Sequence, residues 1–443
     1  MAANLLSDQD RRGPSPSPTF EEATYRKVAW RLVPFLMMCY VVAYLDRVNV
    51  GFAKLQMLTD LKFSETVYGL GSGIFFIGYF LFEVPSNVAL HRVGARVWIA
   101  RIMISWGVLS ALMMFVSSPV MFYVVRFLLG AAEAGFFPGI ILYLTYWYPA
   151  HRRARMTALF MTAVAISGVV GGPLSGWILR DLAGVNGWAG WQWMFLIEGL
   201  PSVLVGILVL FYLDDRVAHA RWLSPEEKAL LARHIEADNA HKVDEPLGKV
   251  LLTGRVWLMG LIYFSFVMGL YGMSFWLPTI IKQTGIADAL TIGLLSAIPW
   301  ACSVVAMIVV ARHADRTGER RWHIAIPAFL GAAGLVFSVL FRENTPLAMG
   351  GLTVGTMGIM TTLPLFWSMP TAFLVGTAAA AGIALINSLG NLSGFVAPYA
   401  VGWLKDQTGS TDSGVYLLAI SLLVGGLLTL SVPAKLVRSP TAT

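Results

Sequence analysis

Two short basic stretches decide the fold of this chain: HRVGAR at residues 91–96 and DRTGERR at residues 315–321. The pattern Arg-x-Gly-x-Arg begins at Arg92 in the first stretch and at Arg316 in the second, an offset of 224 positions. A repeat this long, in a chain of 443 residues, predicts two structurally related halves. Glycine permits a tight turn in each stretch, and the arginines can pair with the ends of helices.

Composition places both halves in a membrane. Hydrophobic residues make up 57% of the sequence and charged residues 13%, against about 25% charged residues in soluble proteins. Long apolar runs without alternation exclude a β-barrel. We therefore predict an all-α membrane protein with twelve transmembrane helices, arranged as two pseudo-symmetric six-helix bundles. Each of the twelve stretches approaches the roughly 20 residues that a membrane helix needs, and their centres lie near Tyr40, Gly78, Ser105, Leu129, Ser167, Ser202, Ser265, Val304, Ala333, Gly358, Ser388 and Leu422.

Polar segments mark the boundaries of these bundles. Residues 1–27 are polar and lack the pattern of a removable signal peptide, so we expect them to form a disordered cytoplasmic tail. In the largest polar interruption, Ser224 is placed to cap a helix that begins at Pro225. The predicted units are a first half at 28–213, a cytoplasmic linker at 214–254, a second half at 255–436 and a short cytoplasmic tail at 437–443.

The distribution of positive charge predicts the orientation. If the N-terminus is cytoplasmic, most of the 32 Lys and Arg lie in segments on that side, and only a few, Lys54 among them, fall in outer loops. The positive-inside rule then places both termini in the cytoplasm, with the chain in the plasma (cell inner) membrane. It also explains the net charge of +7 without nucleic acid as a partner.

Sequence motifs of enzymes and metal proteins are missing. We find no phosphate loop of the form G-x-x-x-x-G-K, no H-E-x-x-H and no G-x-S-x-G elbow. The seven His residues are scattered, and Cys39 and Cys302 fall in separate predicted membrane helices, where we expect packed side chains rather than a disulfide. We therefore expect a protein that is not an enzyme and has no cofactor and no metal.

The predicted fourth membrane helix carries two ionisable residues on one face. Arg126, Gly130 and Glu133 are spaced i, i+4, i+7 and so share a face. Ionisable residues inside membrane helices are costly and usually functional. An Arg and a Glu on one buried face can exchange partners as the Glu gains and loses a proton, the minimal requirement for proton coupling. The alternative is a permanent ion pair that only fixes the helix.

The predicted first helix supplies a candidate anion site. Tyr40, Tyr44 and Arg47 share a face, while Asp46 lies about 100° round the helix from Arg47. A guanidinium at membrane depth suits a carboxylate, which it binds through two parallel hydrogen bonds. We expect Arg47 to point into a cavity and Asp46 toward a neighbouring helix. The alternative places both residues at the outer membrane surface.

Other polar residues are candidates for contacts with a substrate. Tyr79 lies in the second helix, on one face with Glu83, which we expect to be structural. Asn387 and Asn391 share a face of the eleventh helix and can form hydrogen bonds with hydroxyls or carboxylates. Hydrogen bonds between helices explain these amides almost as well. Weaker candidates, because aromatic residues are common in packing, are Trp276, Trp367 and Ser368.

These motifs resemble those of the major facilitator superfamily over nearly the whole chain. The Arg-x-Gly-x-Arg loops are similar to its cytoplasmic signature, with the family's Asp present at Asp315 and missing from the first half. Narrower motifs resemble the anion:cation symporter family, in the bacterial branch of tartrate and other organic-acid permeases: YLDRVN at 44–49, GYFLFEVPSN at 78–87, RFLLGAAEAG at 126–135 and INSLGN at 386–391. The resemblance implies that Arg47 and Tyr79 bind substrate and that Asp46 and Glu133 couple protons.

Together these observations predict a monomeric secondary transporter in the lipid bilayer. We expect proton-coupled uptake of a small organic carboxylate anion, such as tartrate, a sugar acid or an aromatic acid, by alternating access. The expected substrate-binding residues are Arg47, Tyr44, Tyr79, Asn387, Asn391, Trp367 and Ser368. The expected proton-coupling residues are Asp46, Glu133 and Arg126.

One motif favours a different transporter class. GVVGGPLSG at residues 168–176 nearly matches the signature of drug/proton antiporters in the same superfamily. Its physical content is only close packing of helices around a proline. Arginines inside the helices would also repel cationic drugs. The antiporter is therefore kept as the alternative to symport.

Overall fold

The computed structural model describes residues 18–240, 253–373 and 376–434, and over these residues its regular elements are all helices. The first half contains α1 (Pro18–Val48), α2 (Val50–Leu61), α3 (Glu65–Val93), α4 (Ala95–Leu112), α5 (Pro119–Glu133), α6 (Phe136–Thr145), α7 (Ala150–Met161), α8 (Ala163–Asp181) and α9 (Gly190–Tyr212). Between the halves lies α10 (Pro225–Ala240). The second half contains α12 (Gly254–Gln283), α13 (Ala289–Thr317), α14 (Arg321–Leu340), α15 (Thr345–Phe366), α16 (Pro370–Phe373), α17 (Gly376–Thr408) and α18 (Asp412–Ser431).

These helices account for the predicted membrane crossings. In the described part of the chain, 11 segments are long and apolar enough to cross a membrane, with α1 and α2 counted together and α5 and α6 counted together. The remaining expected crossing, centred near Ser388, lies in α17, a helix of 33 residues. The all-α membrane fold is therefore confirmed.

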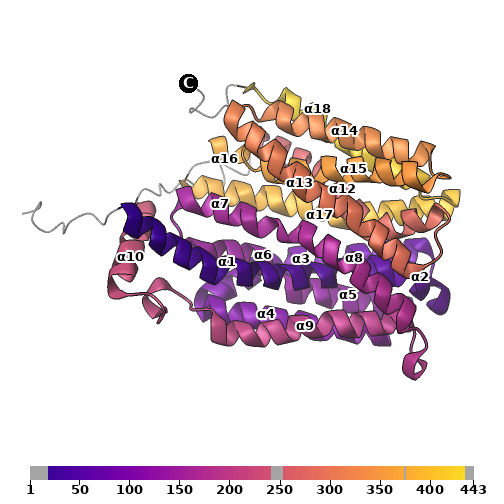
Figure 1. Ribbon diagram of the computed structural model, residues 1–443, viewed down its shortest axis with the longest axis horizontal. Coiled ribbons are helices and arrows are strands. Elements are labelled where there is room, and N and C mark those ends of the chain that lie inside the picture. Colours follow the sequence, from indigo (N-terminus) through magenta and orange to yellow (C-terminus); the bar gives the residue numbers. More distant parts are fainter. Residues whose placement is uncertain (1–17, 241–252, 374–375, 435–443) are drawn as a thin grey trace, which may run out of the picture.

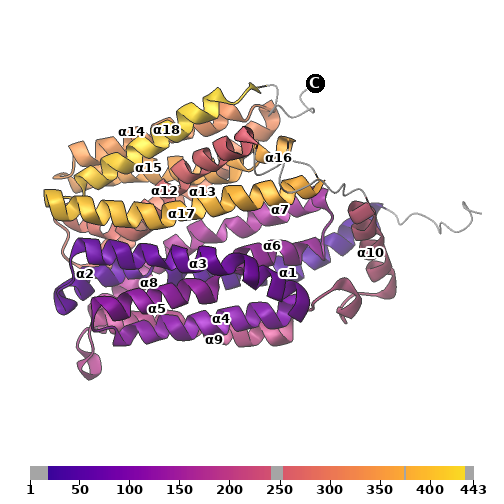
Figure 2. The same cartoon turned by 180° about the vertical axis from the view of Figure 1, so that it is seen from behind.

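The two halves lie side by side with their helices roughly parallel (Figure 1). They meet along two seams, one between α3 and α17 and the other between α8 and α13, with a smaller contact between α2 and α12. The view from behind shows α17 lying along α3 (Figure 2). We call the end that holds α10 and the start of α1 the terminal end, and the end that holds α2 the distal end (Figure 1).

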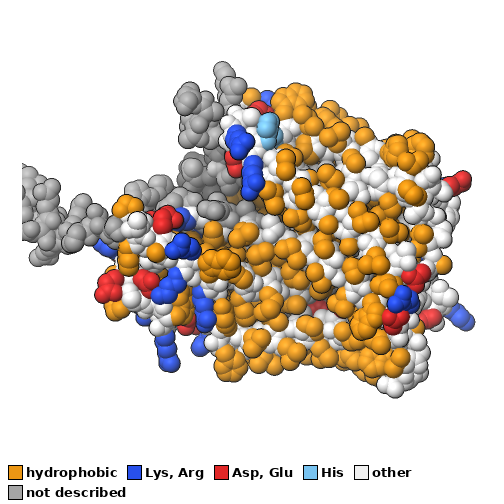
Figure 3. All heavy atoms as spheres, viewed as in Figure 1, with side chains coloured by type: hydrophobic (Ala, Val, Ile, Leu, Met, Phe, Trp, Pro, Cys, Tyr) orange, Lys and Arg blue, Asp and Glu red, His pale blue; other side chains and the backbone are white. Residues whose placement is uncertain are grey.

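The surface of the bundle fits a bilayer. Hydrophobic side chains cover most of the flank in Figure 3, and charged side chains gather toward its two ends. Large apolar side chains such as Phe211, Val120 and Leu340 are more than two-thirds exposed in the protein alone. Such a belt needs lipid around it, because contiguous apolar surface of this extent is not stable in water.

Both repeated basic stretches form the turns that their glycines predict. Gly94 has φ 102° and Gly318 has φ 65°, conformations that favour glycine. The Arg96 backbone N–H donates to Asp215 Oδ1 at 2.9 Å, and Arg320 pairs with Asp315 at 2.8 Å. Each turn therefore joins two helices of one half and is held by a carboxylate.

The linker helix begins where the sequence predicts. Helix α10 starts at Pro225, and the Ser224 hydroxyl accepts a hydrogen bond from the Glu227 N–H at 3.2 Å. Glu227 Oε2 accepts one in return from the Ser224 N–H at 2.8 Å. This reciprocal pair is a capping box, so the prediction is confirmed.

Two sequence expectations are wrong. Residues 18–27, expected in a disordered tail, belong to α1. Side chains that are distant in the sequence contact this segment: Arg152 pairs with Glu21 at 2.8 Å, and the Tyr25 hydroxyl lies 3.0 Å from His234 Nδ1.

The second wrong expectation concerns Lys54. Lys54 was expected in an outer loop, but it lies in α2 and is only 4% exposed. Local composition cannot reveal such long-range contacts. The expected tails at residues 1–17 and 437–443 lie outside the described residues.

Candidate functional site

Arg47 is the centre of a buried polar cluster between the halves. It lies in the last turn of α1 and is 5% exposed. Its guanidinium donates to Glu133 Oε1 through two nitrogens, with Nε at 3.1 Å. A third nitrogen, Nη1, donates to the Tyr271 hydroxyl of α12 at 3.2 Å. Arg47 therefore joins a carboxylate of its own half to a hydroxyl of the other half.

A break in one helix places the Glu133 carboxylate where backbone geometry is irregular. Helix α5 ends at Glu133 itself, whereas α1 continues into α2 after Arg47, because Asn49 has helical dihedral angles and its N–H donates to the Leu45 carbonyl oxygen at 2.9 Å. Gly135, which has φ 84°, turns the chain before α6 starts. Interrupted membrane helices are common around transporter binding sites, since they leave polar backbone groups free for ligands.

Aromatic rings surround the Arg47 guanidinium. Its carbon Cζ lies 5.7 Å from the ring centroid of Tyr44, 5.4 Å from that of Phe75 and 5.5 Å from that of Tyr79. Rings at this distance attract a cation through their quadrupoles. The Tyr44 hydroxyl lies 3.2 Å from Ser274 Oγ of α12. The expected residues Tyr44 and Tyr79 are thus brought together with Arg47.

Asp46 faces away from Arg47, as the helical geometry predicts. Its carboxylate accepts hydrogen bonds from Trp106 Nε1 and Ser110 Oγ of α4, both at 2.9 Å, and from Ser202 Oγ of α9. Asp46 is 1% exposed. The expectation that Asp46 points to neighbouring helices is confirmed, and both residues lie inside the bundle rather than at its surface.

Arg126 does not pair with Glu133 in this conformation. It is fully buried and donates to the carbonyl oxygens of Gly71 at 3.3 Å and Ser72 at 3.2 Å. Residues seven apart on a helix share a face, but they are about 10 Å apart along its axis. A permanent ion pair between Arg126 and Glu133, the alternative considered above, is therefore wrong, because the partner of Glu133 comes from α1. The exchange of partners on protonation stays a prediction.

The two asparagines of α17 serve different partners. Asn391 Oδ1 accepts from the Tyr271 hydroxyl at 3.4 Å, which extends the Arg47 cluster into α17. Asn387 Nδ2 donates to Glu83 Oε1 of α3 at 3.3 Å. Asn391 is thus one hydroxyl away from Arg47, while Asn387 joins the halves through Glu83.

The remaining candidates lie apart from Arg47. The Trp367 ring packs against the Tyr263 ring, with centroids 4.9 Å apart. The Ser368 hydroxyl donates to the Leu365 carbonyl oxygen of its own turn at 2.6 Å. Trp276 lies at the distal end, with its ring centroid 3.5 Å from Lys54 Nζ. These three residues make no described hydrogen bond to the Arg47 cluster.

Sequence reasoning missed Tyr271 and Ser274. The signal for Tyr271 was available, because the offset of 224 that relates the two basic stretches also carries Arg47 onto Tyr271. Equivalent positions of the first helix in each half therefore meet at the centre. We find no comparable sequence signal for Ser274.

A small cavity of about 30 Å³ lies near the Arg47 cluster, beside Tyr44, Asn49, Ser167, Ser274 and Trp300. It can hold a water molecule but not an organic acid. Among the described residues no group of three or more His, Cys, Asp or Glu is placed to hold a metal ion.

Comparison with known proteins gives a consistent result. A family model described as the Major Facilitator Superfamily matches residues 36–398. A protein of Agrobacterium vitis named "Putative tartrate transporter" is 52% identical over 416 residues, which cover 93% of this chain and 91% of that protein. A quinolone resistance transporter of Acinetobacter baumannii is 41% identical over 429 residues, which cover 96% and 98% of the two chains.

A solved structure has the same fold. The xylose transporter XylE from E. coli, in a partially occluded inward open conformation, aligns with a TM-score of 0.74 at 14% sequence identity. The alignment covers 93% of this chain and 99% of XylE.

Proposed function

Because the chain belongs to the major facilitator superfamily and is a multi-pass membrane transporter rather than an enzyme, we propose that it takes up a small organic carboxylate together with protons. Tartrate, a sugar acid or an aromatic acid would fit this class. A relative at 52% identity carries the name of a tartrate transporter. The site residues supply the more specific argument.

The Arg47–Glu133 pair carries this proposal. One buried guanidinium is held by one buried carboxylate, and breaking such a pair without compensation is costly. A substrate carboxylate can take the place of Glu133 on Arg47 only if Glu133 becomes neutral. Protonation of Glu133 therefore accompanies anion binding. Release of the anion lets Arg47 recapture the ionised Glu133, and the proton leaves on the same side.

Asp46 is the second proposed proton-coupling residue. It lies about 100° round α1 from Arg47, among donors from α4 and α9. A change in its protonation would change the bonds between α1 and these helices. Arg126 is bound to backbone carbonyls of α3. Its positive charge would favour the ionised form of Glu133 at a distance, without a hydrogen bond between the two side chains.

The energetics favour coupling for an anion. A membrane potential that is negative inside opposes entry of each negative charge by about 2.3 kcal/mol per 100 mV. One proton per charge removes this cost, and further protons would drive accumulation. A carrier that moved the anion inward without a proton would have to work against the membrane potential.

The second half would recognise the rest of the substrate. Tyr271 and Asn391 form a neutral hydrogen-bonded pair beside Arg47. Such groups can bind hydroxyl or carbonyl oxygens. We propose Asn387, Trp367 and Ser368 as further contacts, reached when the halves move.

The proposed orientation has the terminal end in the cytoplasm of a bacterium, with the protein as a monomer in the inner membrane. Its basis is the gathering of Lys and Arg in segments at that end, which follows the positive-inside rule. The Arg-x-Gly-x-Arg turns and Arg152 belong to these segments.

The rival function is drug export by proton antiport. It has support from the quinolone resistance relative and from the glycine-rich motif at residues 168–176. In the structure, however, this motif packs α8 onto α13, where an added Cβ at Gly172 would collide with the Gly293 carbonyl oxygen. Packing therefore explains the glycines without export.

Counterflow in proteoliposomes tests the proposal. Vesicles would be preloaded in turn with tartrate, galactonate, phthalate, hydroxyphenylacetate or nicotinate and mixed with labelled acid outside. We expect at least one acid to exchange, and Arg47→Ala to abolish exchange while Arg101→Ala, a peripheral arginine that packs on Trp98, retains it. Expulsion of cationic dyes against a proton gradient, with exchange of none of the acids, would favour the antiporter.

A further inference from the structure

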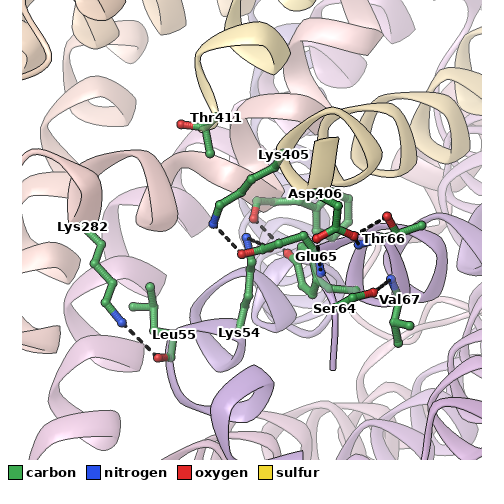
Figure 4. A network of polar contacts seen from close by, with 12 residues as sticks. Lys54, Leu55, Ser64, Glu65, Thr66, Val67, Lys282, Lys405, Asp406 and Thr411 are labelled. Atoms are coloured by element: carbon green, nitrogen blue, oxygen red, sulfur yellow. Dashed lines mark hydrogen bonds and ion pairs between the residues drawn. The ribbon is translucent and has the colours of Figure 1, made fainter. Parts of the chain in front are cut away.

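A network of charged and aromatic residues joins the two halves at the distal end (Figure 4). The first half contributes Lys54, Glu65 and Thr66, and the second half contributes Trp276, Lys405 and Asp406. We call these six residues the distal network. It lies at the opposite end of α3 from the basic turn at Gly94, away from the Arg47 cluster.

Glu65 binds two ammonium groups that come from opposite halves. Lys54 Nζ of α2 lies 2.7 Å from Glu65 Oε2, and Lys405 Nζ of α17 donates to Glu65 Oε1. Lys54 is buried, and its ammonium lies 3.5 Å from the ring centroid of Trp276 of α12. A buried cation is stable only with an opposite charge or a ring face beside it. Here the ring comes from the second half.

Asp406 binds the first turn of a helix in the opposite half. Helix α3 begins at Glu65, and the Asp406 carboxylate accepts the backbone N–H groups of Glu65 at 3.2 Å and Thr66 at 2.7 Å. It also accepts the Thr66 hydroxyl. A carboxylate at a helix N-terminus satisfies unpaired N–H groups and the positive end of the helix dipole. Nearby, Lys282 Nζ of α12 donates to the Leu55 carbonyl oxygen of α2 at 3.2 Å.

Close backbone packing accompanies the distal network along both seams. An added Cβ at Gly69 would collide with the Pro398 carbonyl oxygen, and one at Gly402 with the Glu65 carbonyl oxygen. On the other seam, an added Cβ at Gly176 would meet the Ala289 carbonyl oxygen at 2.5 Å. The distal end is therefore closed by direct helix contact on both sides of the site.

We propose that the distal network is a latch that holds the distal end shut and must break when the substrate enters from that end. The inference rests on the proposed alternating access. If the halves part at this end, Lys405 leaves Glu65, Asp406 leaves α3 and Trp276 leaves Lys54. The latch thus opposes the outward-open state through contacts that are far from the substrate.

The charges of the latch are balanced within each half, which allows the two halves to separate. After separation the first half keeps Lys54 with Glu65, and the second half keeps Lys405 with Asp406. Each half therefore retains one positive and one negative group, so neither is left with a net charge.

Thiol labelling in the absence of substrate tests the latch. The reporter is Ser296→Cys, a residue of the α8–α13 seam that is 2% exposed and lies outside the distal network, in a background with Cys39 and Cys302 replaced by Ser. A membrane-impermeant maleimide is added from outside to cells that produce the protein. Lys405→Ala should raise the rate of labelling by at least about fivefold, and Glu65→Gln by more, because it also leaves Lys54 without its carboxylate.

Arg342→Ala is the matched control. Arg342 follows the end of α14 and pairs with Asp412, the first residue of α18. Both residues belong to the second half, so loss of this pair should leave labelling unchanged. Equal labelling rates in Lys405→Ala, Glu65→Gln and the reporter alone would overturn the proposal. The assay needs neither substrate nor protons, so it separates failure of the latch from failure of the proposed carboxylate uptake.

A cross-link provides a second measurement that does not depend on weakening the fold. Thr66→Cys with Asp406→Cys replaces two side chains that are in hydrogen-bond contact. Oxidation should lock the distal end and stop uptake of any acid that the intact protein exchanges, and reduction should restore it. Undiminished uptake in fully cross-linked protein would overturn the latch.

Discussion

The two halves of this transporter have the same plan and different chemistry. In the described part of the chain, every charged side chain that is buried lies in the first half: Asp46, Arg47, Lys54, Glu83, Arg126, Glu133 and Glu198. From Asn344 to Leu404 the second half has no Asp, Glu, Lys, Arg or His at all. Opposite Arg47 the second half places neutral groups: the Tyr271 phenol accepts from Arg47 and donates to the Asn391 amide.

This contrast suggests a division of labour. Interactions between charges in a low-dielectric interior are strong but costly, and the half that carries these charges is the one to which we assign the proton and the anion. Neutral hydrogen-bonding groups cost less and discriminate by shape. The pseudo-symmetry makes the division visible, because Arg47 and Tyr271 occupy equivalent places and differ in charge.

The largest effect is expected from removing the charge that defines the first half. Arg47→Ala should weaken acid binding by about 30-fold to several thousand-fold, since truncating one member of a buried charge pair costs about 2–5 kcal/mol. Isothermal titration in detergent, with an acid that exchanges in counterflow, measures this change. Arg101→Ala is the control, and an unaltered affinity in Arg47→Ala would remove the guanidinium from the site.

The next effect concerns the proton. Glu133→Gln should still exchange acid across the membrane but should no longer accumulate it under a proton gradient, because its amide cannot release a proton. A gradient of one pH unit drives about tenfold accumulation per coupled proton in the intact protein, since about 1.4 kcal/mol corresponds to a factor of ten. Comparing gradient-driven uptake with counterflow measures the loss. Full accumulation in Glu133→Gln would assign Glu133 a structural role.

A smaller effect would measure the contribution of the second half. Tyr271→Phe removes the hydroxyl between Arg47 and Asn391 and retains the ring that packs on Phe76. We expect acid affinity to fall about fivefold, the effect of about 1 kcal/mol for one hydrogen bond. Proton-driven accumulation should persist. If Tyr271→Phe instead abolished coupling, the second half would take part in proton handling and the contrast between the halves would fail.

The smallest effect is expected at Ser368. Its hydroxyl already donates to the Leu365 carbonyl oxygen, a bond that does not require a substrate. If Ser368 contacts the substrate after the halves move, as we propose, this bond is exchanged for one of similar strength, so Ser368→Ala should raise the apparent KM only about twofold, as determined from initial rates over a range of acid concentrations. An unchanged apparent KM would remove Ser368 from the substrate contacts.

The sequence predicted the elements well because they depend on local chemistry. Hydropathy identified the helices, Gly94 and Gly318 identified the turns, and Ser224 identified the start of α10. The same reasoning failed where a partner comes from another helix. The i, i+7 spacing put Arg126 and Glu133 on one face, but Glu133 accepts its hydrogen bonds from Arg47 of α1.

Lys54 illustrates the same limit. A lysine beyond the end of an apolar run is ordinarily exposed, and the sequence gives no sign that Trp276, more than 200 residues away, covers it. Asp46 could be oriented correctly from the helix geometry alone, yet its donors Trp106 and Ser202 belong to other helices. Packing between helices decides such contacts, and no local pattern encodes it.

The central claim is that a proton enters with the acid, and it can be measured directly. Proteoliposomes loaded with the pH indicator pyranine would receive an acid that exchanges in counterflow, with no gradient of pH imposed and the membrane potential clamped by potassium and valinomycin. Our account predicts acidification of the lumen that follows acid influx in the intact protein and is lost in Glu133→Gln. Influx with no change of internal pH, or alkalinisation of the lumen, would contradict it.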